Sequence, residues 1–205
     1  MGRGPPKSTA VLTLMVILLT AALAFLYTAY SDLQERYREL KHNYEALAPE
    51  ADVIIINDRD YYSVAKELIE AANESVYIIM YVLKYDPGDP DDPANALVWA
   101  LGNASARGVE VAVIIEGETA ETSEAAYNYF MKVGVNATWD REGVRTHCKL
   151  VVVDRYLVLV GSHNWTESAL SYNHETSVLI RSEKAAEAEI RYFNQIWAEA
   201  TATGG

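Results

Sequence analysis

Four side chains within one eighteen-residue stretch carry groups that could act together on a phosphate ester: His147, Lys149, Ser162 and Asn164. An imidazole is nucleophilic near neutral pH because its unperturbed pKa lies close to that range. An ammonium and a carboxamide can hold the non-bridging oxygens of a phosphodiester and offset the charge that develops on them in the transition state. A hydroxyl can donate a further hydrogen bond to the same oxygens. The set therefore indicates chemistry on a phosphodiester.

The stretch that carries these residues is predicted to fold as a β-hairpin. Residues 146–153 and 156–160 are two apolar runs rich in β-branched side chains, and the polar pair Asp154-Arg155 joins them. The second strand would return the chain to Gly161, next to the start of the first strand. The hairpin therefore brings the residues at its two ends together.

The direction of each side chain follows from the two-residue period of a strand. His147 and Lys149 are expected to point to one face of the hairpin and Cys148 to the other. Cys148 is the only cysteine in the chain, and we expect it to be a small buried hydrophobic residue rather than a nucleophile. Residues 165–171 are predicted to form a short helix with Asn164 as its N-cap. The N–H groups at that helix start would add to an anion site.

As a pattern, the stretch is H-x-K, four residues, D, six residues, then G-S-x-N. It resembles the HKD signature of the phospholipase D superfamily. Further along the chain, Asn173-His-Glu175 resembles the N-x-E element of that family. The order of elements from about Val53 to Trp197 is similar to that of the small single-motif members, such as bacterial endonucleases and the mitochondrial cardiolipin hydrolase/nuclease type.

The resemblance implies a role for each residue that matches the motif. His147 is the expected nucleophile, which would form a phosphohistidine intermediate. Lys149 and Asn164 are the expected phosphate clamp, and Ser162 would contribute to the same pocket. Glu175 is the expected carboxylate that orients His147 through its other ring nitrogen.

Other positions of the motif region are expected to support the site without reacting. Asp154 and Gly161 belong to the motif, and Asp154 at the hairpin turn is expected to be structural. His163 and His174 occupy variable positions and are expected to lie at the surface or behind the site. The family uses two histidines, so the single motif implies a homodimer with its active site across the two-fold axis. The resemblance implies no metal and no other cofactor.

Residues 10–30 form an uncharged run of 21 residues, preceded by the short basic leader of residues 1–9. The run is long enough to cross a hydrocarbon core of about 30 Å at 1.5 Å per residue. A cleaved signal peptide is the alternative, because Ala22-Leu-Ala24 offers small residues for cleavage. We favour an uncleaved single-pass anchor since the apolar run continues to Tyr30.

The orientation of this anchor depends on weak signals. Basic residues lie on both sides of the apolar run. The N-glycosylation sequons that begin at Asn73, Asn103 and Asn136 favour a catalytic domain outside the cytoplasm. An extracytoplasmic catalytic domain is therefore the expectation.

Residues 31–50 are charged and are predicted to form a helical stalk that ends at Pro49. Apolar residues recur along it with steps of three and four, the a/d pattern of about two heptads. A parallel coiled coil would bring two chains together, in agreement with the expected homodimer. An amphipathic helix lying on its own domain is the alternative. The pattern consists of Leu33, Tyr37, Leu40, Tyr44 and Leu47.

Residues 51–205 alternate strand and helix signals, which predicts an α/β domain with a mixed sheet and helices on both faces. We read the loop of residues 86–93, with three prolines, as a stiff segment that screens the cleft. Outside the hairpin, strands are predicted at residues 53–57, 75–85, 109–115, 137–140 and 176–180, and helices at 61–72, 94–106, 123–133 and 183–200.

The charge of the chain bears on the substrate without deciding it. The formal net charge is −12, and all of it lies after residue 50. A nucleic-acid-binding protein usually has a basic footprint, and an acidic body is also repelled by anionic lipid headgroups. A local basic cluster of Arg141, Arg145, Lys149 and Arg155 keeps a nuclease possible. An endonuclease-like phosphodiesterase, a phospholipid headgroup hydrolase and a non-catalytic membrane scaffold all stay open, and the intact motif argues against the scaffold.

Overall fold

The computed structural model describes residues 7–47, 52–141 and 143–202 of the 205-residue chain. The chain divides into two compact units, residues 1–48 and 49–205.

The first unit is a single helix, α1 (Lys7–Leu47), of 41 residues. No glycine or proline interrupts it, and at 1.5 Å per residue it is about 60 Å long. Its segment Met15–Glu39 has a mean hydropathy of 1.6, so it is long and apolar enough to cross a membrane. The predicted apolar run and residues 31–47 of the predicted stalk are therefore parts of one helix, and the predicted end of the stalk at Pro49 lies outside the described residues. The coiled coil stays a prediction.

The second unit is built on a seven-stranded mixed sheet with the strand order β1-β7-β6-β5-β2-β3-β4. The neighbours β2, β3 and β4 are parallel, and every other pair is antiparallel. The strands are β1 (Asp52–Asn57), β2 (Ser75–Met80), β3 (Glu110–Ile115), β4 (Asn136–Trp139), β5 (Lys149–Val153), β6 (Leu157–Gly161) and β7 (Thr176–Arg181).

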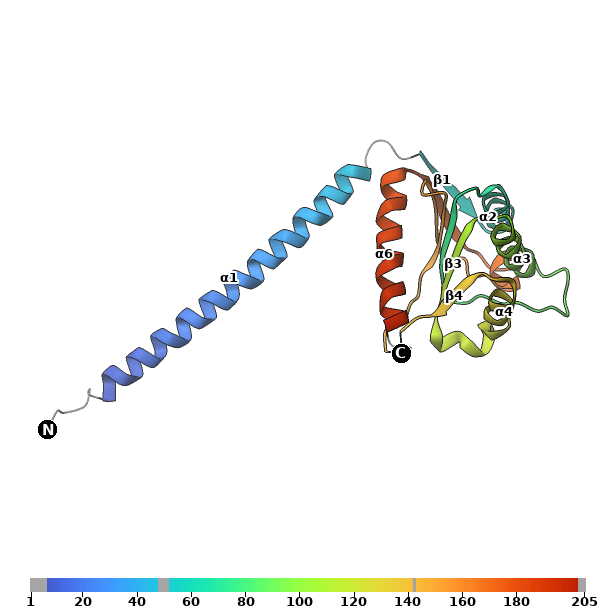
Figure 1. Ribbon diagram of the computed structural model, residues 1–205. Helices are drawn as coiled ribbons and strands as arrows, with labels where there is room; N and C mark the ends of the chain where they lie inside the picture. Colours follow the sequence, from blue (N-terminus) through green and yellow to red (C-terminus); the bar gives the residue numbers. More distant parts are fainter. Residues whose placement is uncertain (1–6, 48–51, 142, 203–205) are drawn as a thin grey trace. The chain divides into compact units, whose positions relative to one another are not determined.

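Helices cover both faces of this sheet, as predicted (Figure 1). One face is covered by α2 (Asp60–Ala71), α3 (Pro93–Ala106), α4 (Ala120–Val133) and α5 (Glu167–Ser171), and the other by α6 (Glu183–Ala202). A short 3-10 turn, η1 (Gly117–Thr119), precedes α4. The central strand β2 is buried at every position because it has helices on both sides.

Alternate residues of each strand enter two separate cores. On β5, Val151 and Val153 pack in the core under α2, α3, α4 and α5, whereas Leu150 and Val152 pack against α6. The same alternation sends Cys148 toward α6, where its Sγ atom lies 3.9 Å from the Tyr192 hydroxyl. The predicted direction of Cys148 is therefore confirmed.

The strand register places the ends that carry the motif at one end of the sheet. Met80 is paired with Lys149 and with Ile115, and Gly161 is paired with Ser177. The carboxyl ends of β2, β3 and β6 therefore lie beside the amino ends of β5 and β7. In α/β sheets, ligands bind in the crevice outside the carboxyl ends of parallel strands.

Two predicted boundaries are wrong near this end, and one interaction explains both. The strand predicted to reach residue 85 ends at Met80. The helix predicted to begin after Asn164 begins at Glu167. Its N-cap is Thr166, whose hydroxyl accepts from the Ala169 N–H at 3.3 Å. Residues 82–84 leave the sheet and bind Trp165 through two backbone hydrogen bonds of 3.0 and 2.8 Å. Because Trp165 is held there in extended conformation, the helix begins two residues later and Asn164 is not its N-cap.

Candidate active site

The motif histidine and lysine lie side by side at this end of the sheet. The Lys149 Nζ atom donates to the His147 carbonyl oxygen at 2.9 Å and lies 3.2 and 3.3 Å from the two nitrogens of the His147 ring. An ammonium can only donate, so the ring nitrogen that it contacts must accept. His147 is exposed, whereas Lys149 is only 6% exposed. Burial lowers the pKa of Lys149, against the opposing effects of Cys148 and Glu175.

Tyr81 lies against both of these residues, although the motif does not include it. Its ring centroid is 4.3 Å from that of His147 and 4.8 Å from the Lys149 Nζ atom. The Tyr81 N–H donates to the Cys148 carbonyl at 2.9 Å, which holds it beside β5. The aromatic face favours the charged ammonium and fixes its position.

The segment after Tyr81 connects the two ends of the motif. The Trp165 N–H donates to the Val82 carbonyl at 3.0 Å. The chain at Tyr81 and Val82 is therefore bonded to Cys148 on one side and to Trp165, the neighbour of Asn164, on the other. The Asn164 Oδ1 atom is buried and has no hydrogen-bond partner among the described residues. An unsatisfied buried amide oxygen is costly, so the Asn164 Oδ1 atom has unused capacity to accept a hydrogen bond from a donor on a ligand.

Glu175 lies in a second polar cluster at the start of β7. Its carboxylate accepts a short hydrogen bond from the Ser162 hydroxyl and another, of 3.0 Å, from the Asn173 side chain. Its N–H donates to the Asp58 carboxylate at 2.9 Å. Within the described residues, both Glu175 oxygens are therefore used by Ser162 and Asn173. The implied hydrogen bond from the His147 ring N–H to the Glu175 carboxylate is not formed in this conformation.

Gly161 is required by the close approach of two strands. A Cβ atom at this position would lie 2.2 Å from the Ser177 Oγ atom, 2.4 Å from the Ser177 Cα atom and 2.4 Å from the Thr176 carbonyl oxygen. Two of these atoms belong to the backbone of β7 and cannot move without breaking the strand pair. Only glycine therefore fits between β6 and β7 here.

Asp154 lies at the opposite end of the hairpin from His147 and holds a turn. It has a φ of 50°, and its carboxylate accepts from the backbone N–H groups of Asn73, Glu74 and Ser75 at 3.0, 2.8 and 3.1 Å. Burial opposes ionisation, but these donors together lower the pKa of Asp154. The motif aspartate thus joins the hairpin turn to the start of β2. Arg155, in the same turn, lies at the other end of β5 from Lys149, so the prediction that it belongs to one basic cluster with Lys149 is wrong.

The two other histidines of the region have different environments. His163 is buried and stacks on Tyr61 at 4.2 Å. Its Nε2 atom is 2.9 Å from the Asp58 carbonyl, which can only accept, so Nε2 carries the hydrogen and Nδ1 accepts from the Ser177 hydroxyl at 2.7 Å. Burial lowers the pKa of His163. His174 is 96% exposed, with its Nδ1 atom 3.5 Å from the Asp58 carboxylate.

A buried pair of carboxyl groups, which the sequence did not reveal, holds the backbone that leads to His147. Both Glu116, at the end of β3, and Asp140, after β4, accept from the Thr146 N–H. They also accept from the N–H groups of η1, Glu116 from Glu118 at 2.9 Å and Asp140 from Gly117 at 2.7 Å. Burial raises the pKa of Glu116, and the neighbouring Asp140 raises it further. Thr146 therefore bonds to this carboxyl pair, and the strand predicted from residue 146 begins only at Lys149.

We expect Glu116→Gln to flatten the pH dependence of stability. The folded protein keeps the Glu116 proton at a pH where the unfolded chain has lost it, so the free energy of unfolding of the wild type falls as pH rises through that window. Glutamine keeps an oxygen for the N–H donors and offers an amide to Asp140. The thermal midpoint, followed between about pH 5 and 8, should fall with pH in the wild type and less in the variant. Glu118→Gln, an exposed neighbour, is the matched control; equal slopes in Glu116→Gln and the wild type would contradict this account.

Within residues 7–47, 52–141 and 143–202, no group of three or more histidine, cysteine, aspartate or glutamate side chains could hold a metal ion.

Comparison with known proteins gives a consistent family. A family model described as "Cardiolipin synthase, PLD-like domain" matches residues 65–197. The mitochondrial cardiolipin hydrolase of Chlamydomonas reinhardtii is 28% identical over 107 residues, 52% of this chain and 47% of that protein. The phospholipase D of Rickettsia conorii is 26% identical over 124 residues, 60% of this chain and 57% of that protein. This chain thus spans about half the length of the curated relatives that it matches.

Solved structures agree with the sequence relatives. The phospholipase D family member Nuc from Salmonella typhimurium superposes with a TM-score of 0.64 at 27% identity, over 73% of this chain and 96% of that one. NucT from Helicobacter pylori, at 18% identity and a TM-score of 0.59, shares the fold over 73% of this chain and 98% of that one. The matched residues 65–197 contain the whole stretch from His147 to Asn164 as well as Glu175. This chain therefore belongs to the phospholipase D-like family, in the group whose model is described as the PLD-like domain of cardiolipin synthase.

Proposed function

We propose that this protein is a phosphodiester hydrolase in which His147 is the nucleophile. The observation that carries the proposal is the contact between Lys149 and the His147 ring at 3.2 and 3.3 Å, at the end of the sheet where both motif ends meet. The accepting ring nitrogen has the lone pair that attack on phosphorus needs. A phosphate bound at His147 would bring its oxygens to the Lys149 ammonium, with the Asn164 and Ser162 side chains at the other motif end.

The proposed reaction has two steps. In the first, a His147 nitrogen attacks phosphorus, the bond from phosphorus to the leaving oxygen breaks, and a second histidine protonates that oxygen. In the second, water attacks the phosphohistidine, gives its proton to the second histidine and releases His147. We assign the second histidine to a second copy of the chain, since one copy has one motif. No metal ion takes part in either step of the proposal.

We favour a nucleic-acid strand as the substrate, which makes the protein endonuclease-like. The similarity to Nuc supports this choice, because it extends over 96% of that chain. A phospholipid headgroup is the second candidate, favoured by the relatives named cardiolipin hydrolase and phospholipase D and by the apolar helix α1. In the proposal, α1 anchors the protein in a membrane and residues 51–205 form the catalytic domain outside the cytoplasm.

The substrate test compares both classes under one set of conditions. Full-length protein in detergent micelles, with EDTA present, is incubated with single-stranded DNA and, separately, with cardiolipin vesicles. We expect cleavage of the DNA in the presence of EDTA and its loss in His147→Ala. Lipid turnover that depends on His147 would instead support the second candidate. Equal rates in the wild type and His147→Ala on both substrates would contradict catalysis and leave the scaffold as the better account.

A further inference from the structure

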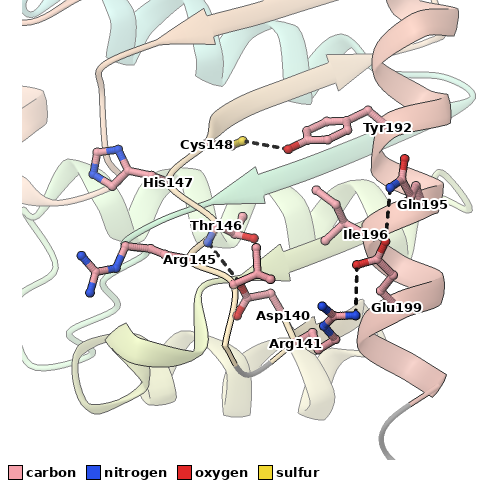
Figure 2. Close-up of a pocket in the computed structure, with 11 residues that line it drawn as sticks. Asp140, Arg141, Arg145, Thr146, His147, Cys148, Tyr192, Gln195, Ile196 and Glu199 are labelled. Atoms are coloured by element: carbon pink, nitrogen blue, oxygen red, sulfur yellow. Dashed lines mark hydrogen bonds and ion pairs between the residues drawn. The ribbon is translucent and has the colours of Figure 1, made fainter. Parts of the chain in front are cut away.

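Arg145 lies two residues before His147 and is not a position of the motif. Figure 2 shows the His147 ring and the Arg145 guanidinium pointing to the same side, away from α6. Arg141, by contrast, contacts Glu199 on α6. Two residues of extended chain span at most about 7 Å. A group bound at Arg145 would therefore lie next to a group bound at the proposed nucleophile.

Tyr81 is a neighbour that Arg145 shares with the catalytic pair. Hydrogen bonding and charge attraction to Glu118 raise the pKa of Arg145, and attraction to the nearby Tyr81 raises it further. The Tyr81 ring centroid is also 4.3 Å from that of His147 and 4.8 Å from the Lys149 Nζ atom. Arg145 therefore adds a second positive charge to the side of the site on which Lys149 lies.

Glu118 occupies the guanidinium of Arg145 in this structure. The Arg145 Nε atom donates to the Glu118 Oε2 atom at 2.7 Å, and a terminal nitrogen makes a short hydrogen bond to the same oxygen. The two side chains are 59% and 57% exposed, and ion pairs this exposed contribute little. A phosphate offers a separate oxygen to each of the two donors, the arrangement that arginine binds best. A phosphate can therefore replace the carboxylate at low cost.

The backbone that carries Glu118 is held beside the site. The Thr119 hydroxyl donates to the Tyr81 carbonyl at 2.7 Å, and the Glu118 N–H donates to the Glu116 carboxylate at 2.9 Å. Because η1 is fixed in this way, Glu118 can release Arg145 by rotation of its exposed side chain, without any change in the backbone. Its carboxylate is thus a built-in competitor for any anion that approaches Arg145.

The two candidate substrates share one chemical feature that suits a pair of neighbouring cation sites. In a nucleic-acid strand, three sugar carbons link each phosphodiester to the next. In cardiolipin, the three carbons of the central glycerol link two phosphodiesters. The short stretch from His147 to Arg145 matches such a bridge, and the second phosphate replaces the hydrogen bonds that Arg145 loses when Glu118 leaves. A lone phosphodiester has no group to offer there.

We propose that Arg145 binds the phosphate next to the scissile one in a nucleic-acid strand, and that Glu118 occupies Arg145 until this phosphate displaces it. The inference rests on the proposed function, in which His147 attacks the scissile phosphorus of a strand. It makes Arg145 a determinant of specificity and Glu118 its internal competitor. Substrates with two linked phosphodiesters are then favoured over substrates with one.

The test measures kcat/KM of the full-length protein in detergent micelles on d(TpTpT), which has two phosphodiesters, and on d(TpT), which has one. The ratio of the two values, calculated per phosphodiester, isolates the second phosphate. Arg145→Gln should lower this ratio roughly tenfold, the loss expected for hydrogen bonds to a charged group. Glu118→Gln should raise it by up to about fivefold, the most that an exposed ion pair costs to break. An unchanged ratio in Arg145→Gln would overturn the proposal.

Two controls show whether Glu118 acts through Arg145. Arg141→Gln and Glu199→Gln remove a matched exposed ion pair at α6 and should leave the ratio unchanged. Arg145→Gln combined with Glu118→Gln should give the same ratio as Arg145→Gln alone, because the competitor then has nothing to occupy. An equal rise on adding Glu118→Gln with or without Arg145 would overturn the competition and leave only general charge repulsion.

Binding and lipid measurements separate failure of this proposal from failure of the proposed function. Fluorescence anisotropy gives the affinity of His147→Asn, which cannot react, for d(TpTpT) and d(TpT) labelled on a base. Adding Arg145→Gln should lower the ratio of affinities roughly tenfold, even if the wild type turned over neither substrate. An unchanged ratio overturns the subsite even if His147-dependent hydrolysis is observed. A preference for cardiolipin over phosphatidylglycerol that alone depends on Arg145 would assign the subsite to a lipid headgroup and overturn the strand.

Discussion

Lys149→Met is expected to remove most of the activity without lowering thermal stability. The ammonium is proposed to stabilise the charge on the phosphoryl oxygens, and loss of one such group costs about 10²- to 10³-fold in kcat. Stability should not fall, because Lys149 is only 6% exposed and burial lowers its pKa. A lowered lysine pKa means that the charged form is disfavoured in the folded state, so at neutral pH the native protein carries a penalty that methionine does not have.

The measurement is kcat on the better substrate together with the thermal midpoint of the same preparation. Tryptophan fluorescence reports the catalytic unit, because all four tryptophans lie after residue 49. Lys132→Met, on α4, is the control for loss of a positive charge and should change neither value. A large fall in the thermal midpoint of Lys149→Met would show that the lysine acts mainly in folding, against its proposed role.

Gly161→Ala is expected to destabilise the catalytic unit severely. The added Cβ atom would lie 2.4 Å from both the Ser177 Cα atom and the Thr176 carbonyl oxygen, so β6 and β7 must separate locally. Overpacking against backbone should cost at least about 3 kcal/mol, out of a typical total of 5–15 kcal/mol. For a unit of this size the thermal midpoint should fall by at least about 6 °C.

Gly88→Ala is the matched control for this substitution. A Cβ atom at Gly88 would meet only the Asp86 side chain, at 3.2 Å, so its thermal midpoint should stay close to that of the wild type. A Gly161→Ala protein as stable as Gly88→Ala would mean that the two strands can move apart easily. The glycine of the motif would then need a catalytic explanation and not a steric one.

Local patterns predicted those parts of the fold that depend on one face of one element. The two-residue period of a strand correctly predicted that Cys148 points away from the face of Lys149. In the structure Cys148 shares the α6 face with the apolar residues Leu150 and Val152. Alternating strand and helix signals correctly gave a mixed sheet with helices on both faces. These features follow from neighbours in the sequence, where periodicity is a reliable physical signal.

Contacts between distant segments set the features that the sequence did not predict. The strand begins at Lys149 and not at the predicted residue 146, because the Thr146 N–H donates to Glu116 and Asp140, which directly follow two other strands. Asn164 lost its predicted capping role because Trp165 pairs with residues 82–84. Tyr81 lies against His147 and Lys149 only because β2 and β5 are neighbours. No local pattern encodes such pairings, so the motif identified the reacting groups but not the residues that position them.

The central claim is that the His147 ring becomes covalently bonded to phosphorus, and trapping that bond tests it most directly. Full-length protein is mixed with the better substrate, quenched in alkaline denaturant during turnover and digested for mass spectrometry. The account predicts a phosphoryl adduct on His147, absent from His147→Asn and retained in His174→Asn. Turnover without any adduct, or an adduct on Cys148 or Ser162 in place of His147, would contradict it.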